Sequence, residues 1–152
     1  MNTVGTDALG RYFGEAAEKK SGTRYVGIWY SLWLGQHAYM QSAIYDNTKL
    51  LSTEKGRTAL NSNEDSELSR MGEFHFCAEP LYGYYASWDQ WVIRKHLQLL
   101  SFAGIDYLYL DFTNANMNGK NPVNLYPKAT YALMDTILEM QAEGYNVPQI
   151  VP

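Results

Sequence analysis

The sequence predicts an α/β fold: a partial (β/α)8 TIM barrel with the order β-α-β-α-β, parallel strands and a chain that stops after its third strand. Three observations lead to this prediction. Three short runs are dense in apolar and aromatic residues, two longer segments between them space apolar residues as a helix does, and a glycine follows each of these two segments. Strands that alternate with helices in this way form parallel sheets with right-handed crossovers.

The first predicted strand covers residues 24–33 (RYVGIWYSLW), a nearly continuous apolar run that is typical of a strand buried on both faces. Residues 1–23 form a polar lead-in segment, with a short helix expected around residues 16–20. Residues 24–152 then form one incomplete barrel domain. Within it, residues 35–87 make a long first βα loop, with short helices expected, for example around residues 48–51, and a polar patch, NSNEDSE. Connections of this length are usually functional when they occur.

The first long helix is predicted to follow this loop. Ser87 with Gln90 fits a capping box, and Gly104 supplies the left-handed stop. The apolar or inward positions of this helix, at helical spacing, are Val92, Ile93, His96, Leu97, Leu99, Leu100 and Phe102. Trp91 is also expected in the core. Residues 105–112 (IDYLYLDF) follow as the second buried strand.

The second long helix is predicted to begin at Pro127, a residue suited to the first helical position, and to end at Gln141 or Glu143, just before Gly144. Its expected buried stripe is Leu133, Met134, Ile137, Leu138 and Met140. Residues 147–151 begin the third strand. At 152 residues the chain is short for a closed barrel, which takes about 250 residues.

An open, doubly wound sheet can begin with the same order of elements. Such a sheet usually carries a glycine-rich phosphate loop after its first strand, whereas this chain has LGQHAYM there. A flavodoxin-like sheet without that motif stays open as an alternative. In a barrel, functional groups lie where strands end and βα loops begin. Polar groups with aromatic neighbours occur at both of these places and favour the barrel.

Composition excludes several classes of function. The net charge is −4 and the basic residues are not clustered, which argues against a nucleic-acid partner. No run approaches the roughly 20 apolar residues of a membrane span. The single cysteine, Cys77, excludes an internal disulfide, and no spacing of potential ligands indicates a metal site. We expect no cofactor. The first twenty residues lack the apolar core of a signal peptide, but an upstream export signal and the compartment stay open.

Three segments carry a family resemblance: YVGIWYSLWLGQH, EPLYGYYASWDQWVIRKHLQLLSFAGIDYLYLDFTNA and YPKATYALMDTILEMQAEGYNVPQIVP. They resemble the N-terminal part of bacterial barrel proteins akin to glycoside hydrolase families 71 and 99, and TDALGR looks like the lead-in before the first strand there. The most specific pieces are WLGQH and EPLYGYY. The resemblance implies a carbohydrate-active barrel that acts on a polysaccharide or complex glycan. It also implies that the catalytic carboxylates lie on later strands, beyond the end of this chain.

Glycoside hydrolysis needs two carboxyl groups that flank the scissile bond, and sugar rings stack on aromatic planes. The candidate substrate-binding residues are Trp33, Gln36, His37, Glu79, Tyr82, Tyr84, Tyr85, Asp111 and Asn114. Each also has a structural explanation: Asp111 can bind loop amides, Glu79 can pair with Arg24 or Arg94, and the asparagines Asn114 and Asn116 can form turns. Trp88 is a further aromatic candidate. Asp106 lies at the N-terminal end of its strand, where residues serve stability, and His96 is expected to pack inward.

Three hypotheses remain. The first is the N-terminal fragment of a glycoside hydrolase, inactive alone, that contributes part of a sugar-binding cleft. The second is a non-catalytic glycan-binding or structural module derived from a barrel, and the third is an open-sheet enzyme completed by a partner chain. Barrel closure normally removes sheet edges. The isolated chain is therefore expected to self-associate through its exposed edges.

Overall fold

The computed structural model describes residues 5–13, 24–33, 36–37, 40–41, 43–62, 65–71, 73, 75–111 and 127–151. Its centre is a three-stranded parallel sheet with the order β3 (Gly27–Tyr30), β6 (Tyr107–Leu110) and β7 (Gln149–Val151). Ile28 pairs with Leu108, and Leu108 pairs with Ile150. The predicted parallel sheet of a mixed α/β fold is confirmed, and its three strands lie side by side in the order in which they occur along the chain.

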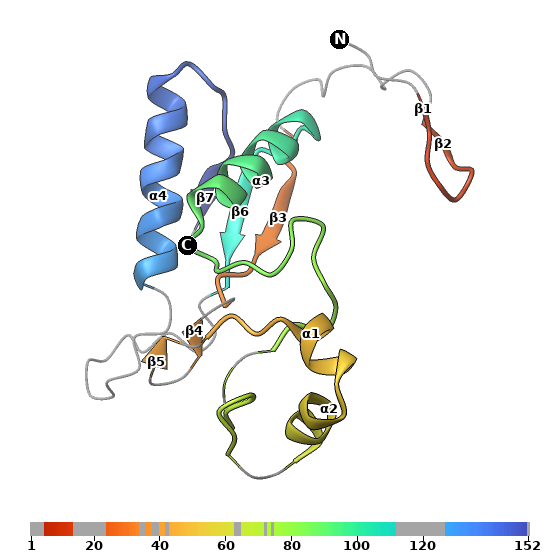
Figure 1. The fold of residues 1–152 in the computed structure, drawn as a ribbon. Coiled ribbons are helices and arrows are strands. Elements are labelled where there is room, and N and C mark those ends of the chain that lie inside the picture. The colour runs from red at the N-terminus through yellow and green to blue at the C-terminus, as the bar shows by residue number, and fades with distance from the viewer. Residues whose placement is uncertain are drawn as a thin grey trace.

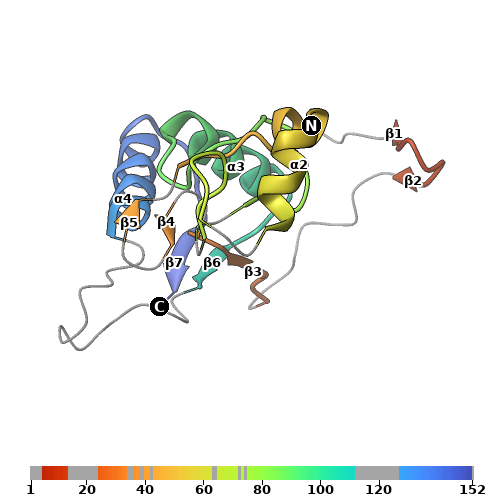
Figure 2. The ribbon, with the colours of Figure 1, turned by 60° about the horizontal axis from the view of Figure 1, so that its bottom comes forward.

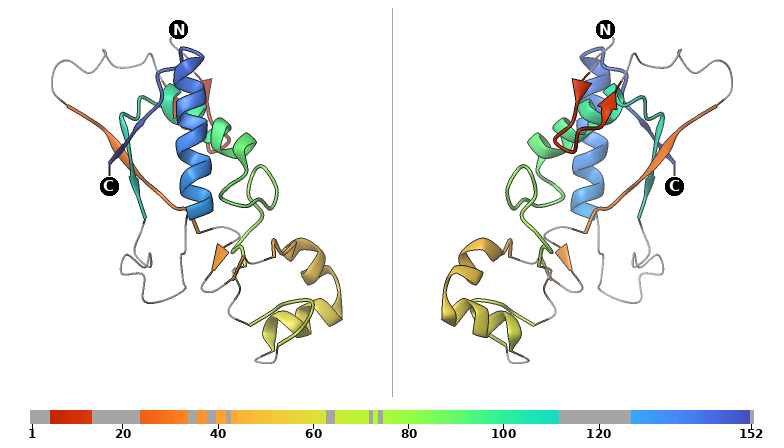
Figure 3. Two further views of the ribbon diagram at one scale, coloured as in Figure 1. Left: turned by 90° about the vertical axis from the view of Figure 1, so that its left-hand side faces the viewer. Right: turned by 90° about the vertical axis from the view of Figure 1, so that its right-hand side faces the viewer.

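Two helices, α3 (Gln90–Phe102) and α4 (Pro127–Ala142), lie on the same face of this sheet (Figures 1 and 3). As predicted, α3 ends just before Gly104 and α4 begins at Pro127; α4 ends at Ala142, between the two predicted ends. The predicted capping box is wrong, however, because the N-cap of α3 is Asp89, whose carboxylate accepts the Val92 N–H at 3.2 Å. Ser87 instead is buried. Gly104 and Gly144 have φ of 74° and 88° after the two helices, as their predicted role requires.

The apolar core lies between the sheet and these helices. Its members are Leu32, Ile93, Leu97, Leu108, Leu110, Ala129, Leu133, Ile137, Met140 and Val147. Other predicted core residues are exposed: Trp91, Leu99, Phe102, Met134 and Leu138. Each helix touches the sheet along one narrow stripe, so an apolar residue outside that stripe stays at the surface.

The opposite face of the sheet is bare among the described residues. Side chains alternate along a strand, and the pairing places Trp29 and Tyr109 in one row with Val151. Their exposed fractions are 65%, 52% and 40%. The prediction that the first strand is buried on both faces is therefore wrong in this structure, because helices cover one face only, and the second predicted strand is exposed on the same bare face. Figure 2 shows the two layers.

Two residues tie the amino end of the sheet together. Asp106 accepts the Val26 N–H at its carboxylate Oδ2 (2.6 Å), and its own N–H donates to the Val26 carbonyl oxygen (2.7 Å). Buried or half-buried backbone groups at the start of an edge strand need partners of this kind. The structural role predicted for Asp106 is confirmed.

The lead-in segment contains a small antiparallel hairpin that the sequence analysis did not predict, β1 (Gly5–Thr6) with β2 (Tyr12–Phe13). Asp7 builds its turn by accepting the N–H groups of Leu9 and Arg11 at 2.9 and 2.8 Å. The helix expected around residues 16–20 falls outside the described residues.

The long first loop carries more structure than predicted. It holds a short antiparallel pair, β4 (Gln36–His37) with β5 (Met40–Gln41), and two helices, α1 (Asn47–Ser52) and α2 (Glu54–Asn61). The helix predicted around residues 48–51 is confirmed as α1, and α2 is a further short helix of the kind expected in this loop, at a position that was not predicted. α1 and α2 pack on each other. Figure 1 shows them beyond the carboxyl ends of β3 and β6.

Candidate functional site

The carboxyl ends of β3 and β6 form the edge where an α/β protein usually holds its site. β3 ends at Tyr30, and Asp111, the residue after β6, donates its backbone N–H to the Tyr30 carbonyl oxygen at 3.1 Å. Asp111 is partly buried. Because side chains alternate, it follows on the same face as Tyr109, the face without helices. The predicted carboxylate therefore lies at the expected edge.

A pocket of about 230 Å³ lies beside the end of β3, between this strand and the start of α3. Its described lining is Trp29, Tyr30, Ser31, Tyr85, Ala86, Ser87, Val92 and His96. These residues supply aromatic rings, hydroxyl groups and one imidazole, and none of these eight is acidic or carries a lysine or arginine charge. Ligand pockets are commonly of this composition, with apolar walls and a few placed polar groups. We refer to it as the strand-end pocket.

His96 lies at the centre of the aromatic residues around this pocket. Its ring lies 5.9 Å from the ring of Tyr30, 6.1 Å from that of Tyr82 and 5.8 Å from that of Tyr85, measured between centroids. The Tyr30 hydroxyl is 3.0 Å from His96 Nδ1. β3 thus supplies one tyrosine, the stretch before α3 supplies two, and α3 supplies the histidine.

Burial determines the ionisation of this cluster. Loss of water around the ring lowers the pKa of His96 below its ordinary 6.5, so the imidazole is neutral at pH 7. The same loss of water raises the pKa of Tyr30, with the nearby Tyr85 phenol adding to the shift, and it raises the pKa of Tyr85 as well. Both phenols therefore keep their protons. The site offers neutral donors and acceptors.

Sequence reasoning placed His96 in the packing of α3 and assigned it no other role. The structure shows that it also lines the strand-end pocket. A signal was present, since His96 is the one polar residue among the predicted inward positions of α3. Tyr30 was not singled out either, although it lies in the predicted first strand. The predicted Tyr82 and Tyr85 both contact His96.

Glu79 and Tyr84 come together elsewhere, at the start of α1. Thr48 Oγ1 donates to Glu79 Oε2 at 2.8 Å and lies 2.9 Å from the Tyr84 hydroxyl, which also accepts the Thr48 N–H. Glu79 thus binds a threonine rather than Arg24 or Arg94, and Arg94 pairs with Glu143. Phe76 packs edge-on against both Tyr84 and Tyr85, so this group adjoins the strand-end pocket.

The remaining predicted residues divide into two groups. Trp33 is partly buried and packs against the apolar core. The ammonium nitrogen of Lys128 lies 4.2 Å from the centroid of the Trp88 ring. Gln36 and His37 form β4, but their side chains lie outside the described part of the structure, as do Asn114 and Asn116 entirely. Of the predicted residues, Tyr82 and Tyr85 contact His96, and Asp111 follows the end of β6.

His75 belongs to a separate polar cluster. It stacks on Tyr45 with 4.3 Å between ring centroids, and its Nε2 lies 3.1 Å from Ser69 Oγ. Its Nδ1 is 3.1 Å from the Glu73 carbonyl oxygen, and the Tyr45 hydroxyl donates to the Glu73 carboxylate. These contacts join Ser69, Glu73 and His75 to Tyr45, which lies just before α1. Ser69 is buried, so we assign this cluster a structural role in holding the loop together.

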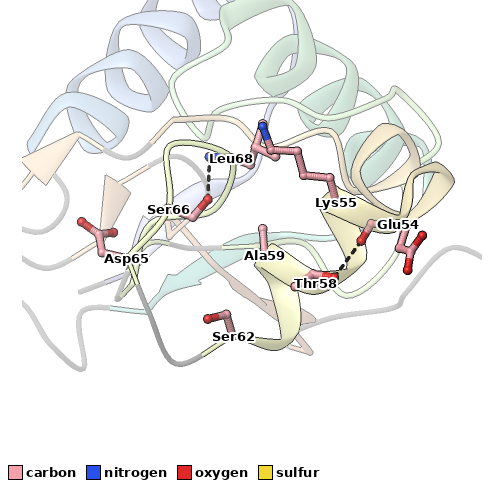
Figure 4. A pocket seen from close by; sticks show the side chains of 8 residues that line it. All are labelled: Glu54, Lys55, Thr58, Ala59, Ser62, Asp65, Ser66 and Leu68. Atoms are coloured by element: carbon pink, nitrogen blue, oxygen red, sulfur yellow. Dashed lines mark hydrogen bonds between the residues drawn. The ribbon is translucent and has the colours of Figure 1, made fainter.

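A larger pocket, about 740 Å³, lies between α2 and the turn at residues 65–68 (Figure 4). It is lined by Glu54, Lys55, Thr58, Ala59, Ser62, Asp65, Ser66 and Leu68. Its described lining has no aromatic ring. Thr58 donates to the Glu54 carbonyl oxygen, and Ser66 accepts the Leu68 N–H, so these hydroxyls serve their own turns. The strand-end pocket is the stronger candidate, although it is smaller.

The described residues contain no group of three or more histidine, cysteine, aspartate or glutamate side chains arranged to hold a metal ion. Across the same residues, none of the helices has the length and apolar character needed to span a bilayer.

Comparison with known proteins found no matching family model, no matching curated protein and no matching solved structure.

Proposed function

We propose that this chain forms the first three strands of a (β/α)8 barrel from a carbohydrate-active protein, and that the strand-end pocket is part of its sugar-binding cleft. The observation that carries the proposal is the pocket itself, in which aromatic rings and neutral polar groups meet at the carboxyl end of the first strand. Sugars present apolar C–H faces and many hydroxyls, which such a lining suits.

The arrangement of the sheet supports the barrel. Its three strands occur in sequential order, with both helices on one face. A flavodoxin-like open sheet has the order 2-1-3 and would place the first strand in the middle, so the observed order disfavours it. The first half of a classic doubly wound sheet, 3-2-1, however, shares the observed order. Within the described residues, the outer edges of β3 and β7 have no strand partner, and the face that carries Trp29 and Tyr109 is bare. In a barrel, further strands cover those edges and that face becomes the interior.

The chain by itself should bind sugars and leave them intact. Hydrolysis needs a pair of carboxyl groups about 5–10 Å apart across the bond. The described lining of the strand-end pocket supplies none, and Asp111 is the carboxylate at the same sheet edge. We expect Asp111 to accept a sugar hydroxyl. The catalytic pair belongs to later strands in this proposal.

The test is binding by the full chain to a panel of neutral hexaoses: cello-, xylo-, manno-, laminari- and maltohexaose. Affinity is measured by NMR titration, and release of reducing sugar is measured in parallel. Tyr85→Ala should weaken binding roughly tenfold, which corresponds to about 1.4 kcal/mol. The matched control is Tyr131→Ala, which removes a 65% exposed tyrosine from α4. If no hexaose binds, or if both variants lose affinity equally, the proposal fails.

The bare sheet face also predicts self-association of the isolated chain. Contiguous exposed apolar side chains and unpaired strand edges both promote pairing with another copy. Sedimentation velocity should show concentration-dependent growth in mass, and Trp29→Lys should reduce it. A monomer over the whole concentration range would count against the barrel part of the proposal.

A further inference from the structure

The strand-end pocket contains one side chain that can change its hydrogen-bonding character, His96. A neutral imidazole has one nitrogen that donates and one that accepts, and the partner of one nitrogen determines the role of the other. Here Nδ1 is engaged by the Tyr30 hydroxyl at 3.0 Å. Among the described contacts, Nε2 has no partner. Nε2 is therefore the nitrogen that remains for a ligand.

Chemistry decides which partner of the Tyr30–His96 pair donates. Both groups are neutral at pH 7, because burial raises the pKa of the phenol and lowers that of the imidazole. A phenol is a stronger acid than the N–H of a neutral imidazole, and an imidazole nitrogen is a far stronger base than a phenol oxygen. The stronger hydrogen bond is thus O–H to Nδ1. The imidazole proton then lies on Nε2.

We propose that His96 is the specificity-determining residue of the strand-end pocket: Tyr30 holds its Nε2–H as a donor, and this donor binds a hydroxyl or ring oxygen of a neutral sugar unit. The inference rests on the proposed sugar-binding function and adds to it the chemical class of the ligand. The described lining provides no cation to pair with a carboxylate. The carboxylate of a uronate would lose its hydration in this pocket, and no cation of the described lining would compensate for that loss. A uronate should therefore bind several-fold or more weakly than a neutral sugar. Neutral sugars are accepted on this basis, and anionic ones are rejected.

His75 gives an internal reference for the tautomer. Its Nδ1 faces the Glu73 carbonyl oxygen at 3.1 Å, and a carbonyl oxygen only accepts. The proton of His75 must therefore lie on Nδ1, with Nε2 accepting from Ser69. The two histidines are expected to show opposite tautomers in one sample.

The experiment is a long-range proton–nitrogen NMR spectrum of the uniformly labelled full chain, in which the imidazole nitrogen shifts distinguish the two tautomers. We expect Nε2–H for His96 and Nδ1–H for His75. Addition of the tightest-binding neutral hexaose should move the Nε2 signal of His96. Mannohexaose and β-1,4-linked hexamannuronate, which share a backbone linkage, then compare neutral and anionic ligands, and the uronate should bind at least tenfold more weakly.

Tyr30→Phe removes only the hydroxyl that sets the tautomer. It should convert His96 to a mixture of tautomers and weaken binding of the neutral hexaose in proportion to the lost donor form, about twofold for an equal mixture. Tyr109→Phe is the matched control, since it removes a hydroxyl from an exposed tyrosine of the neighbouring strand and should change neither property. Circular dichroism of both variants checks that the fold is kept.

The outcomes separate this inference from the proposed function. A His96 that carries its proton on Nδ1 overturns the inference even if hexaoses bind and perturb Tyr85. Equal or tighter binding of the uronate overturns the assignment to neutral sugars. The expected tautomer with no response of any pocket signal to any hexaose overturns the proposed function, and the recognition role of His96 with it.

Discussion

Two regions of the molecule are stabilised in different ways. The α/β unit, comprising residues 24–33, 87–111 and 127–151, contributes every member of the apolar core. The connecting segment, residues 43–86, is held mainly by individual polar contacts, such as Asn47 to the Phe76 carbonyl oxygen and Tyr45 to Glu73. Its buried side chains are few. Apolar burial is non-directional and leaves a periodic pattern in the sequence, whereas single hydrogen bonds leave none.

The largest expected effect is in the core. Leu97 is fully buried on α3, and Leu97→Ala should lower the free energy of unfolding by about 2–5 kcal/mol, because it removes apolar contacts and leaves a cavity. Leu51→Ala, at a position on α1 that is 53% exposed, should change it by less than about 0.5 kcal/mol. Urea unfolding measures both. Similar losses would mean that the two regions share one core.

The second effect is within the connecting segment. A Cβ at Gly56 would lie 2.1 Å from the Leu50 carbonyl oxygen, which is backbone and cannot rotate away. Gly56→Ala gains up to about 1 kcal/mol of helix propensity, but the forced separation of α1 and α2 should cost about 1–3 kcal/mol. Hydrogen exchange should rise in residues 47–61 and stay unchanged in α3 and α4. Lys55→Ala, at an exposed neighbouring position, is the control. Unchanged exchange in α2 would contradict this packing.

A smaller effect isolates backbone strain. Gly144 has φ of 88° and open space where a Cβ would lie, so Gly144→Ala should cost about 1–2 kcal/mol purely through its left-handed conformation. Gly10 has the same features with φ of 76° but lies in the hairpin turn. Gly10→Ala should therefore leave the cooperative thermal transition almost unmoved. A shift of equal size for both would show that the hairpin unfolds together with the α/β unit.

The smallest expected effect is a dependence of stability on pH. Because the folded protein holds the pKa of His96 below 6.5, the unfolded chain binds more protons just below that pH. The free energy of unfolding should therefore fall as the pH drops from about 6.5 toward the lowered pKa, and should level off below it. His96→Leu should remove this part of the slope in urea unfolding curves at several pH values. An unchanged slope would mean that His96 is solvated in the folded protein.

Sequence reasoning succeeded for elements that a local pattern encodes. The spacing of Ile93 and Leu97 predicted α3, and Pro127 with Gly144 bracketed α4. It failed where two local signals competed, since both Ser87 and Asp89 are suitable caps and the tertiary structure buries the first. It also did not locate α2, because this helix contains a glycine, Gly56, which is unfavourable in a helix interior. Its N-cap is the exposed Thr53.

The candidate site shows the same limit. Tyr82 and Tyr85 were named as candidate binding residues because they belong to the aromatic stretch before α3. His96 was assigned to packing alone. Tyr30 and His96 are 66 positions apart in the chain. Only the packing of α3 on β3 brings the two rings together.

By itself, the sequence determined the order of the three sheet strands and of α3 and α4, and the parallel sheet, because these follow from local periodicity and from glycine and proline geometry. The tertiary structure alone decided which face of the sheet is covered, which apolar residues stay exposed and which polar groups meet at the end of β3. Those outcomes depend on contacts between residues far apart in the chain. No local pattern encodes such contacts, because each is a choice among many partners that only packing resolves.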